Sequence, residues 1–535
     1  MTAKSVPPAA GIVPEGPQFL GHPRGLFVLF FAEMWERFSY YGMRAILVFY
    51  LLQHWLFSED KAYLIYGAYT ALVFITPVVG GYLADRYIGQ RKAVQFGAIL
   101  LVIGHGLMAI EGDGGQDSAA LNVFWLALAF IIMGVGFLKA NISVIVGQLY
   151  RQGDARRDPA FTIFYMGINL GAFMGSLLVG YLGTVYGWSW GFGAAGVGML
   201  LGLVVFVWGR SSLLGHGEPP HPQRLQRRVA GLKTEWWIYL WGIVGVGVVT
   251  MLVQYQGVVG WLLGLAGLCV IVYLLLTAVS RLERIQRHRI FAAMFLIGLQ
   301  PLFWALFEQA GSSLNVYTKE EVDRVVFGWE VPASMFQSIN AFYIMTLGPV
   351  FAWLWMFLAR RGWEPSTPAK FGLGLVQLGA GFLVLVAGAA SVATGSLTPL
   401  VFIFLIYMLH TMGELCLSPV GLSAMTKLAP VSMVSLLMGT WFLASAAGNY
   451  IAGLVARATG GEAEAGALAT PVLDVYQRIG WLAVAVGIGV IVVSPWVRRL
   501  MHEDVDGDDG GHLAGQGEIG EPDAAGIHTE SERAS

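Results

Sequence analysis

Apolar runs alternate with short polar segments along almost the whole chain. Fourteen of these runs are long enough to cross a bilayer, because roughly 18 or more apolar residues with few charges are typical of a membrane helix. The pattern therefore predicts an all-α polytopic membrane protein with fourteen transmembrane helices. The predicted helices are 26–53, 61–84, 93–111, 121–149, 160–184, 188–209, 236–254, 257–280, 289–316, 332–359, 370–392, 398–428, 433–457 and 472–498.

The longer polar segments divide these helices into groups of six, two and six. Six helices precede a basic linker at 210–235, two follow it, and six more follow a second basic turn, RLERIQRHR. Two six-helix bundles with a site at their interface are a common architecture of transporters. We predict a mobile leader at 1–25, a first bundle at 26–209, linkers with an inserted helical hairpin at 210–288, a second bundle at 289–500 and a disordered acidic tail at 501–535.

Composition and charge agree with a membrane protein. Hydrophobic residues make up 56% of the chain and charged residues 12%, whereas a soluble domain has about 25% charged residues. If both termini lie on one side, most Lys and Arg residues fall on that side, which the positive-inside rule identifies as the cytoplasm. We therefore expect a multi-pass protein of the plasma or inner membrane, in contact with the lipid bilayer. The formal net charge of −2 gives no indication of nucleic acid binding.

The first predicted helix carries ionisable side chains at membrane depth. A charge at the bilayer centre costs roughly 3 kcal/mol or more, so such a face must line a polar cavity or meet opposite charges on other helices. Ion pairs that only lock helices together are the alternative. The residues on or beside this face are Glu33, Glu36, Arg37, Tyr40 and Arg44.

Three later helices also carry a charge far from either end: Lys139, Glu308 and Glu414. Together with the first helix they nearly balance acids against bases, which indicates a shared polar cavity with one carboxylate able to take a proton. A buried carboxyl group binds a proton more readily when its cationic partner leaves. This coupling is a physical basis for movement driven by protons.

Five motifs, in order along residues 24–500, resemble those of the proton-dependent oligopeptide transporters, a family of the major facilitator superfamily. The resemblance implies the major facilitator fold, with a two-helix insertion typical of bacterial members. It also implies a proton-coupled symporter that imports di- and tripeptides by alternating access. The motifs are ExxERFxYYG at 33–42, GGYLADRYIG at 80–89, FYMGINLGAF at 164–173, FEQAGSS at 307–313 and GELCLSPVGLS at 413–423.

The resemblance assigns the two ends of a bound peptide to opposite halves of the chain. Arg37 and Lys139 would face the peptide carboxylate, with Glu33 and Glu36 adjusting their charge. Glu414 would receive the amino terminus. A guanidinium group suits a carboxylate because its donor fork matches two oxygens.

Further binding residues follow from the same resemblance. Asn169, Asn340 and Tyr40 would hydrogen-bond the peptide backbone. Trp441 and Ser445, in GTWFLASAAGNY, resemble the wall of the family's pocket.

The resemblance also implies a gate and a loop motif. Arg44 and Glu308 would form a salt bridge that closes the outer side and breaks when Glu308 takes a proton. Gly81, Asp85 and Arg86 belong to the cytoplasmic loop motif. We expect Gly80 and Gly81 to allow close helix packing and Asp85 to cap or bridge a neighbouring helix.

Several points stay open. Phe74 stands where the family pattern has a tyrosine, which would remove a hydroxyl from the pocket. His410, one turn before Glu414, either joins a proton relay or packs as a structural residue; for His105 we expect a structural role. Cys269 and Cys416 lie in apolar helices, where a small hydrophobe is expected rather than a disulfide or metal ligand.

The alternatives to a peptide symporter are a carrier for nitrate or another small anion and a receptor that does not transport. A membrane hydrolase is disfavoured, since the sequence has no HExxH or GxSxG motif. We expect no enzyme activity and no metal, no cofactor beyond the proton gradient, and a protein that works as a monomer.

Overall fold

The computed structural model describes residues 17–151, 154–393, 395–460 and 471–502. The leader up to residue 16 and the acidic tail from residue 503 lie outside the described residues. The last residues of the predicted leader form a strand pair: β1 (Gln18–Phe19) pairs with β2 (His22–Pro23) immediately before the first long helix. The mobility of the segment up to residue 25 stays a prediction.

Every predicted membrane segment contains a long helix in the structure. Among the described residues, 11 helices are long and apolar enough to cross a membrane by length and composition. Three further long helices, α1, α3 and α15, include charged or polar residues such as Arg37, Lys92 and Asn449. The first group is α1 (Arg24–Gln53), α2 (Glu59–Leu83), α3 (Gln90–Met108), α4 (Ala120–Gln148), α5 (Arg157–Val185) and α6 (Trp188–Trp208).

The linker and the second group follow. A π-helical turn η1 (Ala84–Ile88) extends α2, and the 3-10 turns are η2 (Gly209–Leu213), η3 (Glu308–Gly311), η4 (Ala333–Gln337) and η5 (Val431–Met433). The remaining helices are α7 (Pro222–Gln226), α8 (Thr234–Gln254), α9 (Gln256–Ser280), α10 (Arg284–Phe307), α11 (Ser313–Glu321), α12 (Ser338–Arg360), α13 (Thr367–Ala390), α14 (Val401–Leu428), α15 (Val434–Thr459) and α16 (Pro471–Met501).

The strands are short and lie in the connections. Three pairs are antiparallel: β1 with β2, β3 (Arg228–Val229) with β4 (Leu232–Lys233), and β6 (Val325–Val326) with β7 (Trp329–Glu330). β5 (Val322–Asp323) pairs in parallel with β8 (Thr398–Pro399). These pairs tie down loops and contribute little to the core.

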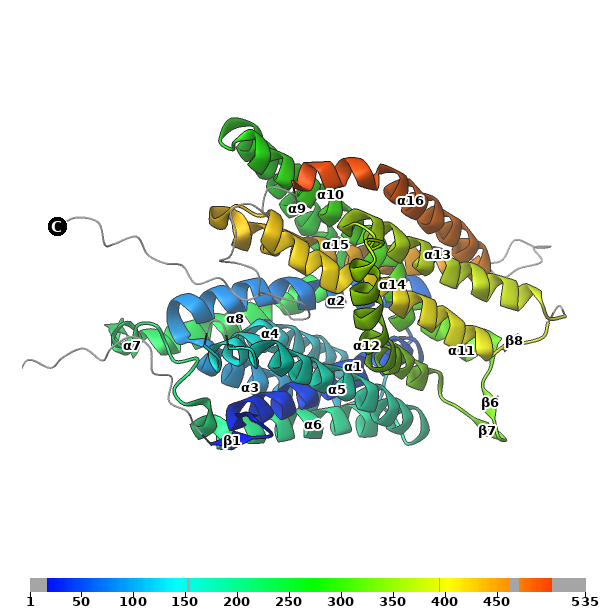
Figure 1. The fold of residues 1–535 in the computed structure, drawn as a ribbon. Helices are drawn as coiled ribbons and strands as arrows, with labels where there is room; N and C mark the ends of the chain where they lie inside the picture. The colour runs from blue at the N-terminus through cyan, green and yellow to red at the C-terminus, as the bar shows by residue number, and fades with distance from the viewer. Residues whose placement is uncertain (1–16, 152–153, 394, 461–470, 503–535) are drawn as a thin grey trace, which may run out of the picture.

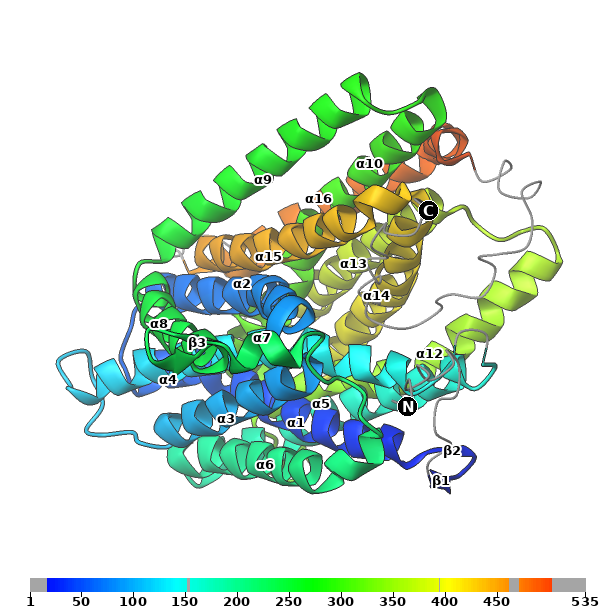
Figure 2. The same cartoon turned by 90° about the vertical axis from the view of Figure 1, so that its left-hand side faces the viewer.

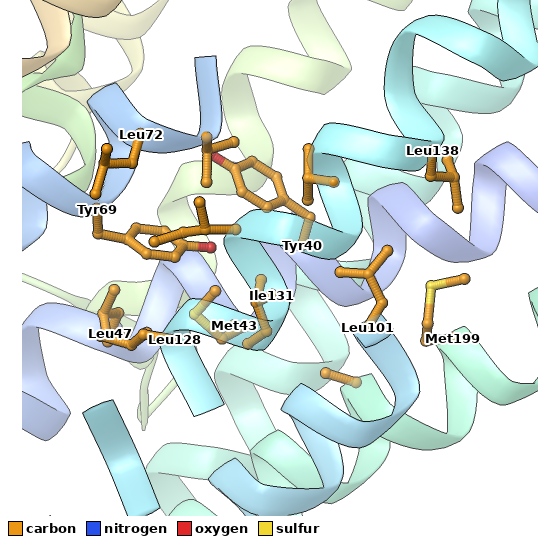
Figure 3. Packing of buried hydrophobic residues seen from close by; sticks show 14 of the residues in the cluster. Tyr40, Met43, Leu47, Tyr69, Leu72, Leu101, Leu128, Ile131, Leu138 and Met199 are labelled. Carbon is orange, nitrogen blue, oxygen red and sulfur yellow. The ribbon is translucent and has the colours of Figure 1, made fainter. Parts of the chain in front are cut away.

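The helices gather around two large apolar cores, one in each half of the chain. The first is built mainly by α1–α6 and includes Tyr40, Tyr69 and Leu101 (Figure 3). The second is built mainly by α10–α16 and includes Phe303 and Phe382. Figure 1 shows the two groups on either side of the molecule.

We name the two ends of the bundle by their connections. The outer end holds the α1–α2 connection, residues 54–58, and the end of α15; the inner end holds the β1–β2 hairpin and the linker between α6 and α8. The inserted hairpin is peripheral: α8 packs on α4, and α9 runs along the outside past α2 and α15 to α10 (Figure 2).

At the outer end, α2 and α15 touch through their backbones. A Cβ atom added to Gly67 would lie 2.9 Å from the Cα of Gly453, and one added to Gly453 would lie 2.6 Å from the carbonyl oxygen of Tyr63. Only glycine permits such an approach. This glycine contact joins the two halves of the chain.

The seventh predicted helix is not continuous. It was expected as one segment over 289–316, but α10 ends at Phe307, η3 follows as a 3-10 turn, and α11 begins at Ser313. The turn coincides with a close approach, since a Cβ atom on Gly311 would lie 1.8 Å from the hydroxyl of Tyr66. A stretch of 3-10 helix within a long helix is often a hinge, and here it carries Glu308.

Candidate functional site

The charged face of α1 is buried and internally paired. Arg37 Nη2 lies 2.6 Å from Glu33 Oε1, and its Nε lies 3.2 Å from Glu36 Oε2. Because Glu33 and Arg37 are four residues apart, they share one helix face. The two glutamates therefore hold the guanidinium of Arg37 in place.

A second buried ion pair joins the two halves. Arg44 Nη2 lies 2.6 Å from Glu308 Oε2, across 264 residues of sequence, and Arg44 Nε donates to the hydroxyl of Tyr66 at 2.6 Å. Arg44 is 9% exposed and Glu308 3% exposed. The predicted pairing of Arg44 with Glu308 is present, and Tyr66 is a third member that the sequence reasoning missed.

Lys139 lies beside the aromatic side chain that departs from the family pattern. Its Nζ is 4.5 Å from the centre of the Phe74 ring, a distance typical of a cation–π contact. Both side chains are partly exposed. Tyr40 is buried and stacks on Tyr69, with ring centres 6.5 Å apart (Figure 3).

In the second half, Glu414 is held by an amide. Asn340 Nδ2 donates to Glu414 Oε2 at 3.0 Å and also to Thr411 Oγ1 at 3.0 Å. Asn340 and Glu414 are both partly exposed. The structure thus brings together Glu414, predicted to receive the amino terminus of a peptide, and Asn340, predicted to hydrogen-bond its backbone, and adds Thr411.

These charges act on a common region. Tyr41 lies within electrostatic range of Arg37, Arg44, Glu308 and Glu414, so residues of both halves converge there. Lys139 is likewise within range of Glu308. Motif charges that are far apart in sequence therefore form one polar region inside the protein.

Three other predicted binding residues are buried and contact other groups of the protein in this structure. Asn169 is buried, and its Nδ2 donates to the Tyr165 carbonyl oxygen in its own helix at 3.0 Å. Trp441 is buried against Phe371, with ring centres 6.3 Å apart. Ser445 is buried too, and its Oγ donates to the Trp441 carbonyl oxygen at 3.2 Å. Their roles toward a ligand stay predictions.

The loop motif lies at the inner end. Asp85 Oδ1 accepts from Gln90 Nε2 at 2.7 Å, so it bridges to the start of α3, and Arg86 is exposed. The close packing predicted for Gly80 is present, since its added Cβ would lie 2.0 Å from the Gly136 carbonyl oxygen. Gly81 has no atom within 4 Å of that position, so its expected packing role is corrected.

The remaining candidates are packed in the interior or lie at the surface. His410 is 3% exposed and lies against Phe382, with ring centres 4.7 Å apart. His105 is fully buried in α3. Cys269 is exposed and Cys416 buried, and both are free thiols. Within the described ranges there is no cluster of three or more His, Cys, Asp or Glu side chains placed to hold a metal ion.

Further polar contacts close the outer end. Asn315 Nδ2 donates to the Ala45 carbonyl oxygen at 3.0 Å, linking α11 to α1. Ser334 Oγ donates to the Gly180 carbonyl oxygen at 3.1 Å. An exposed pair, Arg457 with Asp60, spans α15 and α2 (3.2 Å). No sequence motif could have identified these contacts, because each joins distant segments through a backbone atom or a common surface charge.

Two helical bundles that meet at a buried ion pair, with further charges converging at membrane depth, define a membrane transport protein. Similarity to known proteins supports this class. Residues 91–470 match the POT family. The chain is 37% identical to the peptide transporter YePEPT of Yersinia enterocolitica, covering 91% of this chain and 97% of that protein. It is 34% identical to a di-/tripeptide transporter of Lactococcus lactis, covering 89% and 94%.

A solved structure agrees as well. The crystal structure of a mutant of peptide transporter POT in complex with alafosfalin superposes with a TM-score of 0.78 at 38% identity, covering 91% of this chain and 98% of that one. The protein described here belongs to the POT family of transporters. Its two halves together form the major facilitator fold that the family resemblance implied.

Proposed function

We propose that this protein is a proton-coupled symporter that imports di- and tripeptides by alternating access. The observation that carries the proposal is the buried Arg44–Glu308 pair, which joins the two halves at 2.6 Å. A carrier must break such a contact to open its outer side. A proton on Glu308 removes the negative charge that holds Arg44, so proton binding and opening become one event.

The substrate follows from the charges on the two halves. Arg37 and Lys139 belong to the first half and would face a carboxylate, while Glu414 belongs to the second and would face an ammonium group. A peptide has both groups at its ends, whatever its side chains. Binding one would therefore draw the halves together. The names of the relatives, a peptide transporter and a di-/tripeptide transporter, support this substrate class.

We also propose an orientation and a setting. The inner end faces the cytoplasm with both termini, because basic residues gather there, and the protein lies in the plasma or inner membrane. It works as a monomer, binds no cofactor or metal, and draws its energy from the proton gradient.

The test is uptake of radiolabelled dialanine into proteoliposomes under an inward proton gradient. We expect uptake against the dialanine gradient that stops when a protonophore is added and that unlabelled tripeptide inhibits. No uptake of any di- or tripeptide by a folded preparation would refute peptide transport and leave the anion carrier and the receptor.

A further inference from the structure

The end of α7 and the short hairpin that joins it to α8 form one surface feature, which we name the basic hairpin (residues 224–233). Its strands β3 and β4 are joined by the turn 230–231, in which both residues have positive φ, 50° and 85°. Such turns match the twist of paired strands. A two-stranded hairpin is marginal alone, but Trp237 Nε1 donates to the Val229 carbonyl oxygen at 2.8 Å and the Thr234 amide to that of Arg227 at 2.9 Å.

Apolar contacts also anchor the hairpin to the first half of the chain. Leu225 is 2% exposed and packs in a small apolar cluster with Ala84 and Ile88 of η1. The linker preceding it is fixed as well, because the amide of Arg91 donates to the Gly217 carbonyl oxygen at 2.8 Å. The hairpin is therefore a positioned surface rather than a loose loop.

Four basic side chains of the hairpin are exposed and, among the described residues, form no ion pair. The neighbouring acids are already neutralised: Glu218 pairs with Arg91 at 2.7 Å and Glu235 with Lys92 at 2.6 Å. The local charge is thus strongly positive and uncompensated. The four residues are Arg224, Arg227, Arg228 and Lys233.

Exposed apolar side chains lie next to these basic residues in the sequence. Val229 is 51% exposed, Leu232 47% and Trp236 60%. Exposed apolar groups ringed by Lys and Arg are unfavourable in water but suit the headgroup region of a bilayer, where an apolar tip enters and the cations meet phosphates. Trp is the residue typical of this depth.

We propose that the basic hairpin binds the headgroups of anionic phospholipids in the leaflet at the inner end. The position of the hairpin next to a membrane-spanning helix favours a lipid over a soluble polyanion as the ligand, because Thr234 is the first residue of α8. The hairpin therefore lies at the height where a bilayer surface begins. The identity of this leaflet as cytoplasmic rests on the orientation under Proposed function; the binding itself does not.

The test uses the full-length protein in mixed vesicles of equal phosphatidylglycerol and phosphatidylcholine. Native mass spectrometry of protein released from them measures which lipids stay bound. We expect the parent protein to retain phosphatidylglycerol in preference to phosphatidylcholine. A charge near an anionic surface contributes about fivefold in affinity, so a variant with Arg224, Arg227, Arg228 and Lys233 all changed to Gln should lose this preference at least about tenfold.

The matched control removes four exposed cations elsewhere at the inner end: Arg281→Gln, Arg284→Gln, Arg360→Gln and Arg361→Gln. It should keep most of the preference. An equal loss in both variants, or no preference in the parent, would overturn the proposal. A parent preference that survives in the hairpin variant would place the lipid elsewhere. Transport is not measured here, so this test and the uptake test fail independently.

A separate variant tests whether the exposed apolar side chains of the hairpin enter the bilayer. Leu232→Ser keeps all four charges and should reduce retention of both lipids alike, because insertion does not depend on headgroup charge. Circular dichroism spectra equal to those of the parent would show that each variant is folded. Unchanged lipid retention in a folded Leu232→Ser protein would refute insertion of the tip.

Discussion

Replacing Glu308 with Gln should uncouple opening of the outer end from the proton. The side chain keeps its shape and can still accept a hydrogen bond from Arg44, but the charge that now lies 2.6 Å from the guanidinium is lost. Breaking a buried pair by removing one partner costs about 3–5 kcal/mol, and the remaining hydrogen bond recovers about 1 kcal/mol. The closed outer end should therefore lose about 2–4 kcal/mol of its preference.

This loss is large in terms of populations. At about 1.4 kcal/mol per tenfold change, it shifts the balance of open and closed outer ends by roughly 30- to 700-fold. Spin labels at cysteines introduced for Ser58 and Ala458, with Cys269 and Cys416 replaced, would report the separation of α2 and α15. The variant should populate longer distances at neutral pH, as the parent would only at low pH.

Transport should change in a matching way. The Glu308→Gln protein should exchange dipeptide across the membrane but no longer concentrate it under a proton gradient. Glu330→Gln is the control: Glu330 forms an ion pair with Arg324, but its side chain is 65% exposed. A Glu308→Gln protein with the parent's distance distribution and undiminished accumulation would refute the reasoning that ties the proton to this bridge.

Three further changes test other parts of the structure. Phe74→Leu removes the ring beside Lys139 and should raise the KM for dipeptides by roughly 2- to 30-fold, which corresponds to about 0.5–2 kcal/mol for a cation–π contact. Phe74→Tyr keeps an aromatic ring and should have the KM of the parent protein. Equal KM values for Phe74→Leu and the parent in uptake assays would contradict this role. Gly80→Ala should destabilise the protein by about 1–3 kcal/mol, because the Cβ of the new alanine meets the backbone of α4. Gly81→Ala is the control and should leave the thermal unfolding temperature unchanged. Equal effects of the two substitutions would refute the packing assignment. The pKa of His22 is lowered by burial and by the charge of Arg156, so the folded protein favours the neutral side chain. The stability associated with the neutral side chain is fully present above about pH 6.5 and is lost as the pH falls below that value, because the unfolded chain then binds the proton more readily. Hydrogen exchange of residues 18–23, corrected for intrinsic rates, should therefore be faster at pH 5.5 than at pH 7.5, and a His22→Ala protein should show no such difference.

The helices could be predicted from sequence because the bilayer demands long apolar runs and leaves few alternatives. The charged residues stood out for the same reason: Arg44 and Glu308 are costly at that depth unless paired. Their pairing followed from the family resemblance. Sequence periodicity alone links residues within one helix, as with Glu33 and Arg37, and not across 264 positions.

Other features depend on geometry that no local pattern encodes. Tyr66 lies in an apolar stretch of α2 and reads as a packing residue, yet its hydroxyl meets Arg44 at 2.6 Å. The 3-10 turn at Glu308 interrupts a run that is apolar enough for one continuous helix. Asn169 matches a motif, but its side chain rotamer turns the amide toward its own helix. Rotamers and helix breaks are settled by neighbours that lie far away along the chain.

The contact between Gly67 and Gly453 has a consequence for how the outer end could be manipulated. The two helices meet there through main-chain atoms, so this contact forms without any side chain having to change its rotamer. A single methyl group at position 453 would act as a spacer, favouring the open form by shape alone while every ionisable residue stays in place. Such a protein would separate the mechanical part of the transport cycle from its proton chemistry, allowing each to be measured without the other.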